Sequence, residues 1–165
     1  MKIAIIGMGY VGATLAGALA PHHEVFGVDP DPRDFYEPGL EEARTRVTEV
    51  LTLSHVPPCA AYIICVGTPV GSDDALRRAT REVATHMRDG ALVIVRSTVP
   101  VGTTRNIIRP ILDGSGLLHY QLAVCPERTV EGNALAELFE LPQIIAAETP
   151  EALRLTQDLF KHFGC

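Results

Sequence analysis

Three glycines near the start of the chain have the spacing that binds phosphate groups. Gly7, Gly9 and Gly12 form a Gly-x-Gly-x-x-Gly sequence between an apolar segment and a segment rich in Ala and Leu. Glycine allows a tight turn at the first position, close approach of the backbone to phosphates at the second, and close helix packing at the third. A helix that begins here offers N–H groups and a partial positive charge to an anion. The spacing predicts a site for a dinucleotide pyrophosphate, and a glycine-rich turn of another α/β protein is the alternative.

An acidic residue follows the second apolar segment, Glu24–Val28. Asp29 lies about 20 residues beyond the first glycine, where a carboxylate accepts hydrogen bonds from the adenosine ribose hydroxyls. A carboxylate at this place repels a 2′-phosphate. The sequence therefore favours NAD over NADP as the cofactor.

Strand patterns alternate with helical patterns along almost the whole chain. The expected strands are Lys2–Ile6, Glu24–Val28, Leu51–Leu53, Ala60–Val66, Ala91–Val95, Tyr120–Cys125 and Gln143–Ala147. The expected helices are Val11–Ala20, Leu40–Val47, Asp73–Met87, Gly102–Leu112 and Pro150–Phe163. This order predicts an α/β fold of the Rossmann type, a doubly wound, mostly parallel sheet with helices on both faces. Residues 1–165 are expected to form a single dinucleotide-binding domain.

Clusters of polar residues, glycine and proline follow five of the expected strands. They are the segments 7–12, 29–34, 67–69, 97–104 and 126–128. Ligands of such sheets bind beyond the carboxyl ends of the strands, so the five clusters are expected to converge on one site.

Composition excludes several classes of function. The chain of 165 residues is 47% hydrophobic and carries a net charge of −6 without a basic run, which argues against nucleic-acid or anionic-membrane partners. No apolar run approaches the roughly 20 residues of a membrane span. The start of the chain is not a signal peptide, so a cytoplasmic location is expected. Neither cysteine nor histidine spacing indicates a disulfide framework or a metal site, and Cys65 and Cys125 are expected to be buried, reduced thiols.

In their order along the chain, these clusters resemble the UDP-glucose/GDP-mannose dehydrogenase family. The similar segments are Gly7-x-Gly-Tyr-Val-Gly12, Glu37-Pro-Gly-Leu-Glu41, Val66-Gly-Thr-Pro69, Arg96-Ser-Thr-Val-Pro-Val-Gly-Thr-Thr104, and Pro126-Glu-Arg128 followed by Gly132-Asn-Ala134. The last of these is most similar to the branch that oxidises UDP-N-acetylmannosamine or related UDP-N-acetylhexosamines. In the UDP-glucose and GDP-mannose branches a Phe-Leu pair usually follows that Pro-Glu.

The resemblance implies a two-step oxidation of a sugar 6-hydroxyl to a carboxylate, with two NAD and a cysteine that carries a thiohemiacetal and then a thioester. It implies roles in nucleotide-sugar metabolism and polysaccharide biosynthesis. The residues implied to bind the cofactor, together with those derived above, are Gly7, Gly9, Tyr10, Val11, Gly12, Asp29, Arg33, Val66, Gly67, Thr68, Pro69, Thr98 and Glu131.

Two residues are implied to be catalytic. Thr98 would lie beside the reacting centre, where its hydroxyl could orient a water or polarise an oxygen. Glu127 would be a base for the hydrolytic water. A carboxylate near NAD and an apolar wall can have a raised pKa, which suits it to act as a base. The alternatives are a helix cap for Thr98, a solvated loop carboxylate for Glu127 and a solvated side chain for Arg33.

The chain also departs from the family pattern. It has no Gly-Gly-x-Cys-x-Pro segment with the nucleophilic cysteine, no central helical region with the catalytic lysine and asparagine, and no second α/β domain for the nucleotide sugar. The stretch from Asp29 to Glu37 and the loop after Pro69 are shorter than usual. We therefore expect the NAD-binding half of a longer enzyme, inactive and monomeric alone, whose parent is a homodimer. A UDP-glucose or GDP-mannose enzyme and a stand-alone NAD-binding module with a sensing or scaffolding role are the alternatives.

Overall fold

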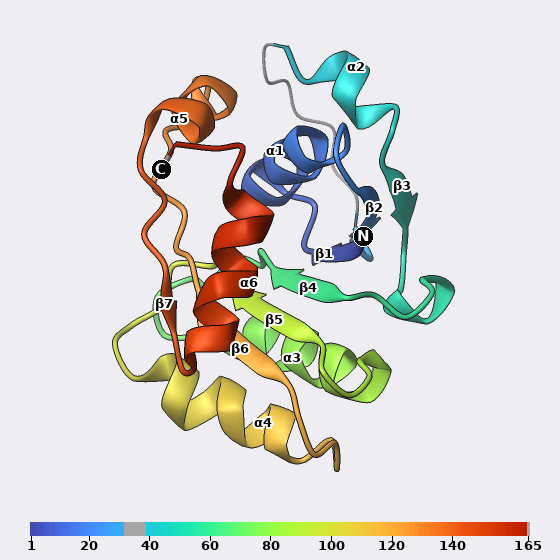
Figure 1. Ribbon diagram of the computed structural model, residues 1–165, viewed down its shortest axis with the longest axis vertical. Helices are drawn as coiled ribbons and strands as arrows, with labels where there is room; N and C mark the ends of the chain where they lie inside the picture. Colours follow the sequence, from blue (N-terminus) through green and yellow to red (C-terminus); the bar gives the residue numbers. More distant parts are fainter. Residues whose placement is uncertain (32–38, 165) are drawn as a thin grey trace.

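A single sheet forms the centre of the fold (Figure 1). The computed structural model describes residues 1–31 and 39–164. The described strands of the sheet are β1 (Lys2–Ile6), β2 (Glu24–Val28), β3 (Thr48–Val50), β4 (Ala61–Ile64), β5 (Leu92–Val95), β6 (Gln121–Val124) and β7 (Ala146–Ala147). Their order is β3-β2-β1-β4-β5-β6-β7, and all pairs are parallel except β6 with β7. The Rossmann-type, mostly parallel sheet predicted from the alternating pattern is confirmed.

Helices cover both faces of this sheet. They are α1 (Tyr10–Leu19), α2 (Glu41–Arg44), α3 (Asp74–His86), α4 (Arg109–Asp113), α5 (Ala134–Glu140) and α6 (Pro150–Phe160), with a 3₁₀ turn at Leu53–His55 and a π-helical turn at Thr104–Ile108. Figure 1 shows α1 and the red α6 on the near face of the sheet and the green α3 behind it. The doubly wound arrangement places the carboxyl ends of β1, β2, β4, β5 and β6 at one edge.

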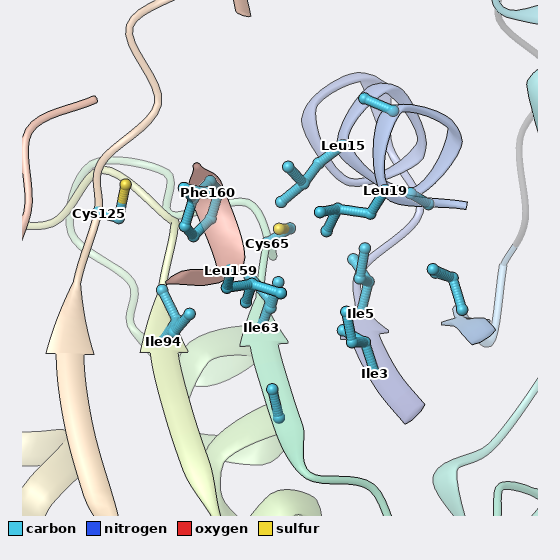
Figure 2. Close-up of a cluster of buried hydrophobic side chains, with 14 of the residues drawn as sticks. Ile3, Ile5, Leu15, Leu19, Ile63, Cys65, Ile94, Cys125, Leu159 and Phe160 are labelled. Carbon is cyan, nitrogen blue, oxygen red and sulfur yellow. The ribbon is translucent and has the colours of Figure 1, made fainter. Parts of the chain in front are cut away.

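Two hydrophobic cores lie on the two faces of the sheet. One joins Ile3, Ile5, Ile63 and Ile94 to side chains of α1 and α6, such as Leu15 and Phe160, as Figure 2 shows. The other joins the alternate strand residues, such as Tyr62 and Val93, to α3 and α4. Successive side chains of a strand point to opposite faces, so one run of apolar residues supplies both cores. Such runs identify buried parallel strands, and every residue of β4 and β5 is indeed buried.

The ends of the helices follow local sequence signals. Helix α6 begins at Pro150, and the hydroxyl of Thr149 accepts a hydrogen bond of 3.0 Å from the N–H of Ala152. The expected helix Gly102–Leu112 is instead a π-helical turn, Thr104–Ile108, followed by α4. Pro110 lacks an N–H and cannot donate the hydrogen bond that would continue a regular helix.

Other expected boundaries were wrong. The third strand is Thr48–Val50 rather than Leu51–Leu53, because the chain turns after Val50 and closes a hydrogen bond of 3.2 Å from His55 N–H to the Thr52 carbonyl. The expected strand Gln143–Ala147 is reduced to β7, which is antiparallel. The expected helix Leu40–Val47 is the single turn α2, and α5 was not expected at all.

Candidate cofactor-binding site

The glycine loop links β1 to α1 through a backbone conformation that requires glycine. Gly7 has a φ of 95°, and a Cβ on it would lie 2.7 Å from the carbonyl oxygen of Cys65. Its N–H donates a hydrogen bond of 2.8 Å to the Val28 carbonyl. The loop is therefore held between β2 and β4, the two strands that flank β1.

Gly9 and Gly12 have opposite surroundings. A Cβ on Gly12 would lie 1.8 Å from the Gly7 carbonyl oxygen, so only glycine lets α1 pack this close to the loop. A Cβ on Gly9 would meet no atom of the described residues within 4 Å apart from its neighbours in the chain, and Gly9 is the N-cap of α1. The first turn of α1 holds no acidic residue. The helix N-terminus and the open space beside Gly9 therefore fit an anion as bulky as a pyrophosphate.

Asp29 faces the glycine loop from the end of β2. Its Oδ2 accepts a hydrogen bond of 2.7 Å from the N–H of Met8, and its Oδ1 accepts one of 2.9 Å from the N–H of Asp31. A carboxylate oxygen has two lone pairs, so each oxygen can accept a further hydrogen bond from a ribose hydroxyl. The half-buried carboxylate is thus fixed in orientation before any ligand arrives.

A cavity of about 350 Å³ opens beside these groups. Its lining brings together five of the predicted cofactor residues, Gly7, Gly9, Asp29, Val66 and Gly67. Cys65 and one face of α3 also line the cavity. The prediction for Arg33, together with Glu37 of the Glu-Pro-Gly-Leu-Glu segment, falls outside the described residues.

Tyr10, Val11 and Glu131 lie away from this cavity. The Tyr10 hydroxyl accepts hydrogen bonds from the N–H groups of Gly132 and, at 3.4 Å, Ala134, so it anchors the loop that precedes α5. Val11 is half-buried in the first turn of α1, and Glu131 is exposed on that same anchored loop. Their contacts with a cofactor stay predictions.

Two further loops at the carboxyl edge are tied together by hydroxyl groups. The Thr68 hydroxyl donates a hydrogen bond of 2.7 Å to the Thr98 carbonyl, and the Ser97 hydroxyl donates one of 2.7 Å to the Val66 carbonyl. Pro69 and Thr98 are exposed there, and the Thr98 hydroxyl has no hydrogen-bond partner among the described residues. It does not cap a helix, because the next helical turn has Thr103 at its N-cap. The hydroxyl remains available to a ligand.

Glu127 belongs to a buried ion pair that the sequence did not reveal. The side chain of Arg96 is 1% exposed, and its Nη2 and Nε donate to Glu127 Oε2 at 2.7 and 3.1 Å. Its Nη1 donates to Gln143 Oε1 at 2.8 Å and to the Cys125 carbonyl at 3.1 Å. The guanidinium carbon lies 5.5 Å from the ring centroid of Phe160. No periodicity distinguishes this arginine from a solvated one, since it directly follows a strand and opens a polar cluster.

The expectation of a raised pKa for Glu127 is wrong. Burial alone would raise the pKa of this carboxyl, but the guanidinium of Arg96 and the N–H groups of Thr129 and Arg128 together lower it below its usual value. Those two N–H groups donate to Oε1 at 2.9 and 2.7 Å. The side chain is only 13% exposed, so it is not a solvated loop carboxylate either. Its role as a base stays a prediction.

The described cysteines are buried and free. Burial raises the pKa of the Cys65 thiol to about 12 and that of Cys59 to about 11, and it also raises the pKa of Cys125. Buried thiols of raised pKa are poor nucleophiles, so none of the three has the setting of an activated catalytic cysteine. Cys165 lies outside the described residues.

The described residues include no group of three or more His, Cys, Asp or Glu side chains that could hold a metal ion. Across the same part of the chain, no helix is long and apolar enough to cross a membrane.

A doubly wound sheet with a glycine loop after β1 and a carboxylate after β2 defines a Rossmann-type dinucleotide-binding domain. The profile of the "UDP-glucose/GDP-mannose dehydrogenase family, NAD binding domain" matches residues 1–164. The chain belongs to this family, and NAD is the cofactor of the domain.

Relatives of known sequence and structure agree with this assignment. A UDP-N-acetyl-D-mannosamine dehydrogenase of Pyrococcus horikoshii is 32% identical over 190 residues, covering 99% of this chain and 45% of that protein. A GDP-mannose 6-dehydrogenase of Pseudomonas syringae pv. syringae is 34% identical over 92% of this chain and 42% of its own length. The solved structure of a UDP-D-ManNAc dehydrogenase from Pyrococcus horikoshii superposes with a TM-score of 0.93 at 29% identity, covering 99% of this chain and 45% of that one.

The chain thus spans about 45% of the length of the Pyrococcus horikoshii relative. That alignment extends over 190 positions, whereas the chain has 165 residues, so the relative carries at least 25 residues without a counterpart here. Shortened internal segments were expected from the sequence.

Proposed function

We propose that this chain is the NAD-binding domain of a nucleotide-sugar 6-dehydrogenase that acts on UDP-N-acetylmannosamine or a related UDP-N-acetylhexosamine. The observation that carries the proposal is the hydrogen bond of 2.7 Å from Met8 N–H to the Asp29 carboxylate, which joins the glycine loop to the carboxylate at one cavity. NAD, when bound, would supply the hydride acceptor for oxidation of the sugar. The residues described here bind and orient the reactants.

Each part of the edge has a distinct task in this proposal. The space beside Gly9 would hold the pyrophosphate, and the Asp29 carboxylate oxygens would accept hydrogen bonds from the ribose hydroxyls. The paired loops that carry Thr68 and Thr98 lie toward the reacting end, where the free Thr98 hydroxyl orients an oxygen of the substrate or a water. The ionised Glu127 carboxylate, bound by Arg96, keeps the following loop in place.

The catalytic thiol belongs to another part of the parent enzyme in this proposal. The described cysteines are buried with raised pKa values, so the domain by itself binds cofactor without oxidising a sugar. The parent is proposed to work as a cytoplasmic homodimer. DNA sequence beyond codon 165 tests this point, because a helical region and a Gly-Gly-x-Cys segment must be encoded there.

The sugar is proposed from the residue after the Pro-Glu pair. Arg128 occupies the place of the aromatic residue of the UDP-glucose and GDP-mannose branches, and its Nη1 donates a hydrogen bond of 3.0 Å to the Pro142 carbonyl. GDP-mannose is the second candidate, because a GDP-mannose 6-dehydrogenase is 34% identical to this chain. Steady-state assays of the parent enzyme with UDP-N-acetylmannosamine, UDP-glucose and GDP-mannose distinguish these substrates.

Calorimetric titration of the purified chain with NAD, and with NADP as the control, tests cofactor binding directly. Saturable binding of NAD with much weaker binding of NADP is the expected result. Equal affinities would contradict the assignment of Asp29, and the absence of NAD binding at millimolar concentration would contradict the proposed function of the isolated chain.

A further inference from the structure

One face of α3 forms the wall of the cavity opposite the glycine loop. Ala75, Arg78, Ala79 and Glu82 all line this cavity, and they occupy positions i, i+3, i+4 and i+7 of the helix. Residues at these positions share one side of a helix. The family resemblance assigned none of them a role, although the helical spacing of Asp73–Met87 was clear in the sequence.

This face combines two small apolar side chains with one planar cation. Ala79 is buried and Ala75 half-buried, so together they leave a low, apolar surface on this face. Arg78 and Glu82 are exposed beside it. A flat aromatic ring fits such a surface, and a guanidinium plane stacks readily on an aromatic ring.

The surrounding charges favour stacking over phosphate binding. Three carboxylates, those of Asp29, Asp31 and Glu82, line the same cavity as Arg78 and oppose a further anion. Arg78 has no ion-pair partner among the described residues, whereas the adjacent Arg77 pairs with Asp73 at 2.9 Å. Its guanidinium is therefore free to lie over a neutral ring that enters the cavity.

We propose that Arg78 covers the adenine ring of the dinucleotide, which rests on Ala75 and Ala79. This inference rests on the proposed function, because it requires that NAD occupy the cavity beside Gly9 and Asp29. It assigns the adenine contact to α3 through a side chain that no cofactor motif contains.

The test is calorimetric titration of wild type and variants with NAD and with AMP, which keeps only the adenosine end. Arg78→Ala should weaken both ligands by the same factor, about tenfold, as expected for loss of one stacking contact. Arg78→Lys keeps the positive charge but lacks the planar guanidinium group, so it should weaken both ligands nearly as much as Arg78→Ala does. Arg81→Ala is the matched control, because Arg81 lies one turn away and lines a separate groove between α3 and α4.

Thermal unfolding of each variant checks that Arg78→Ala leaves the fold intact, as expected for an exposed side chain. Unchanged NAD and AMP affinity in Arg78→Ala, with binding still weakened in Asp29→Ala, would overturn the inference and leave the proposed function standing. In parallel titrations with NADP and 2′-AMP, a loss confined to these two ligands would overturn stacking in favour of a phosphate contact. Failure of the wild-type chain to bind either NAD or AMP would overturn both the proposed function and this inference.

Discussion

Asp29 combines a structural contact with a proposed role in cofactor binding. It accepts a hydrogen bond from Met8 of the glycine loop and one from Asp31, and its remaining lone pairs face the cavity. The residue therefore fixes the loop, and we propose that it also favours NAD over NADP.

Replacing this carboxylate should cost affinity. We expect Asp29→Ala to weaken NAD binding by roughly 1–3 kcal/mol, because buried ribose hydroxyls are left poorly paired. The ratio of NAD to NADP affinity should fall as well, and calorimetry with both ligands measures it. Asp89→Ala is the matched control, since Asp89 accepts a hydrogen bond of 2.9 Å from His119 N–H but does not line the cavity. Equal NAD affinity in wild type and Asp29→Ala would contradict the assignment.

Arg96 and Glu127 form a buried ion pair that is expected to contribute to stability. Removing the cation alone leaves a carboxylate in a site that is only 13% exposed, so Arg96→Met should lower the free energy of unfolding by about 3 kcal/mol. The double variant Arg96→Met/Glu127→Gln should recover part of that loss, because no uncompensated charge remains. Urea unfolding of the two variants and of Glu127→Gln gives the coupling energy. A double variant no more stable than Arg96→Met would contradict an ion-pair explanation.

For single residues, the sequence predicted which residues form the candidate site better than it predicted their burial and their pKa values. The positions of Gly7, Gly9 and Asp29 followed from spacing, because the backbone geometry of a glycine loop is local. The burial of Arg96 depends on Gln143 and Phe160, which are distant in sequence and meet it only in the fold. The pKa of Glu127 consequently could not be predicted in the right direction.

At the scale of elements, the junction of β1 and α1 contains one glycine that is required for packing and another that borders the space proposed for the cofactor. Gly12 has a packing requirement, whereas Gly9 borders open space. The same substitution at the two positions should therefore have different effects.

Gly12→Ala should reduce the free energy of unfolding by at least about 2 kcal/mol, because its Cβ would meet the Gly7 carbonyl oxygen at 1.8 Å. Gly9→Ala should change stability by less than about 1 kcal/mol, yet weaken NAD binding tenfold or more, because its methyl group occupies the space of the pyrophosphate. Chemical denaturation and calorimetry of both variants measure the contrast. Loss of stability without loss of binding in Gly9→Ala would contradict this placement of the cofactor.

Long, strongly patterned elements could be predicted, and short ones could not. The buried strands β4 and β5 and the amphipathic helix α3 were expected within a few residues of their observed bounds. Helix α5 was missed because the polar cluster before it was interpreted only as a motif, although Asn133 followed by Ala-Leu-Ala-Glu-Leu is typical of a capped helix. The short edge strands β3 and β7 depend on pairing with β2 and β6, which no local pattern encodes.

At the scale of the whole molecule, a cluster of histidines lies at the end of α1 opposite the glycine loop. The rings of His22 and His162 stack with centroids 3.9 Å apart, joining the end of α1 to the end of α6. His23 lies beside them, and both of its ring nitrogens are buried without a hydrogen-bond partner among the residues that the structure describes. Burial, the N-terminal amino group, His22, His162 and Lys161 all lower the pKa of His23.

The stability of the chain should therefore fall in mild acid. The folded state binds the His23 proton less tightly than the unfolded state, whose pKa is near the usual 6.5. The contribution is present above pH 6.5 and is lost as the pH falls through this value toward the lower folded pKa. Urea unfolding from pH 7.5 to 5 should show a smaller pH slope in His23→Leu than in wild type, with His55→Leu as the control. Identical slopes would contradict this source of the pH dependence.

The hydroxyl bonds that tie Thr68 to Thr98 and Ser97 to Val66 have a kinetic consequence. Because the two loops share these bonds, a cofactor that packs on Val66 and Gly67 also restrains the backbone of Thr98. NAD binding is therefore expected to slow the motion of the Thr98 backbone further, and hydrogen exchange of the backbone N–H groups of this loop, measured with and without NAD, checks this.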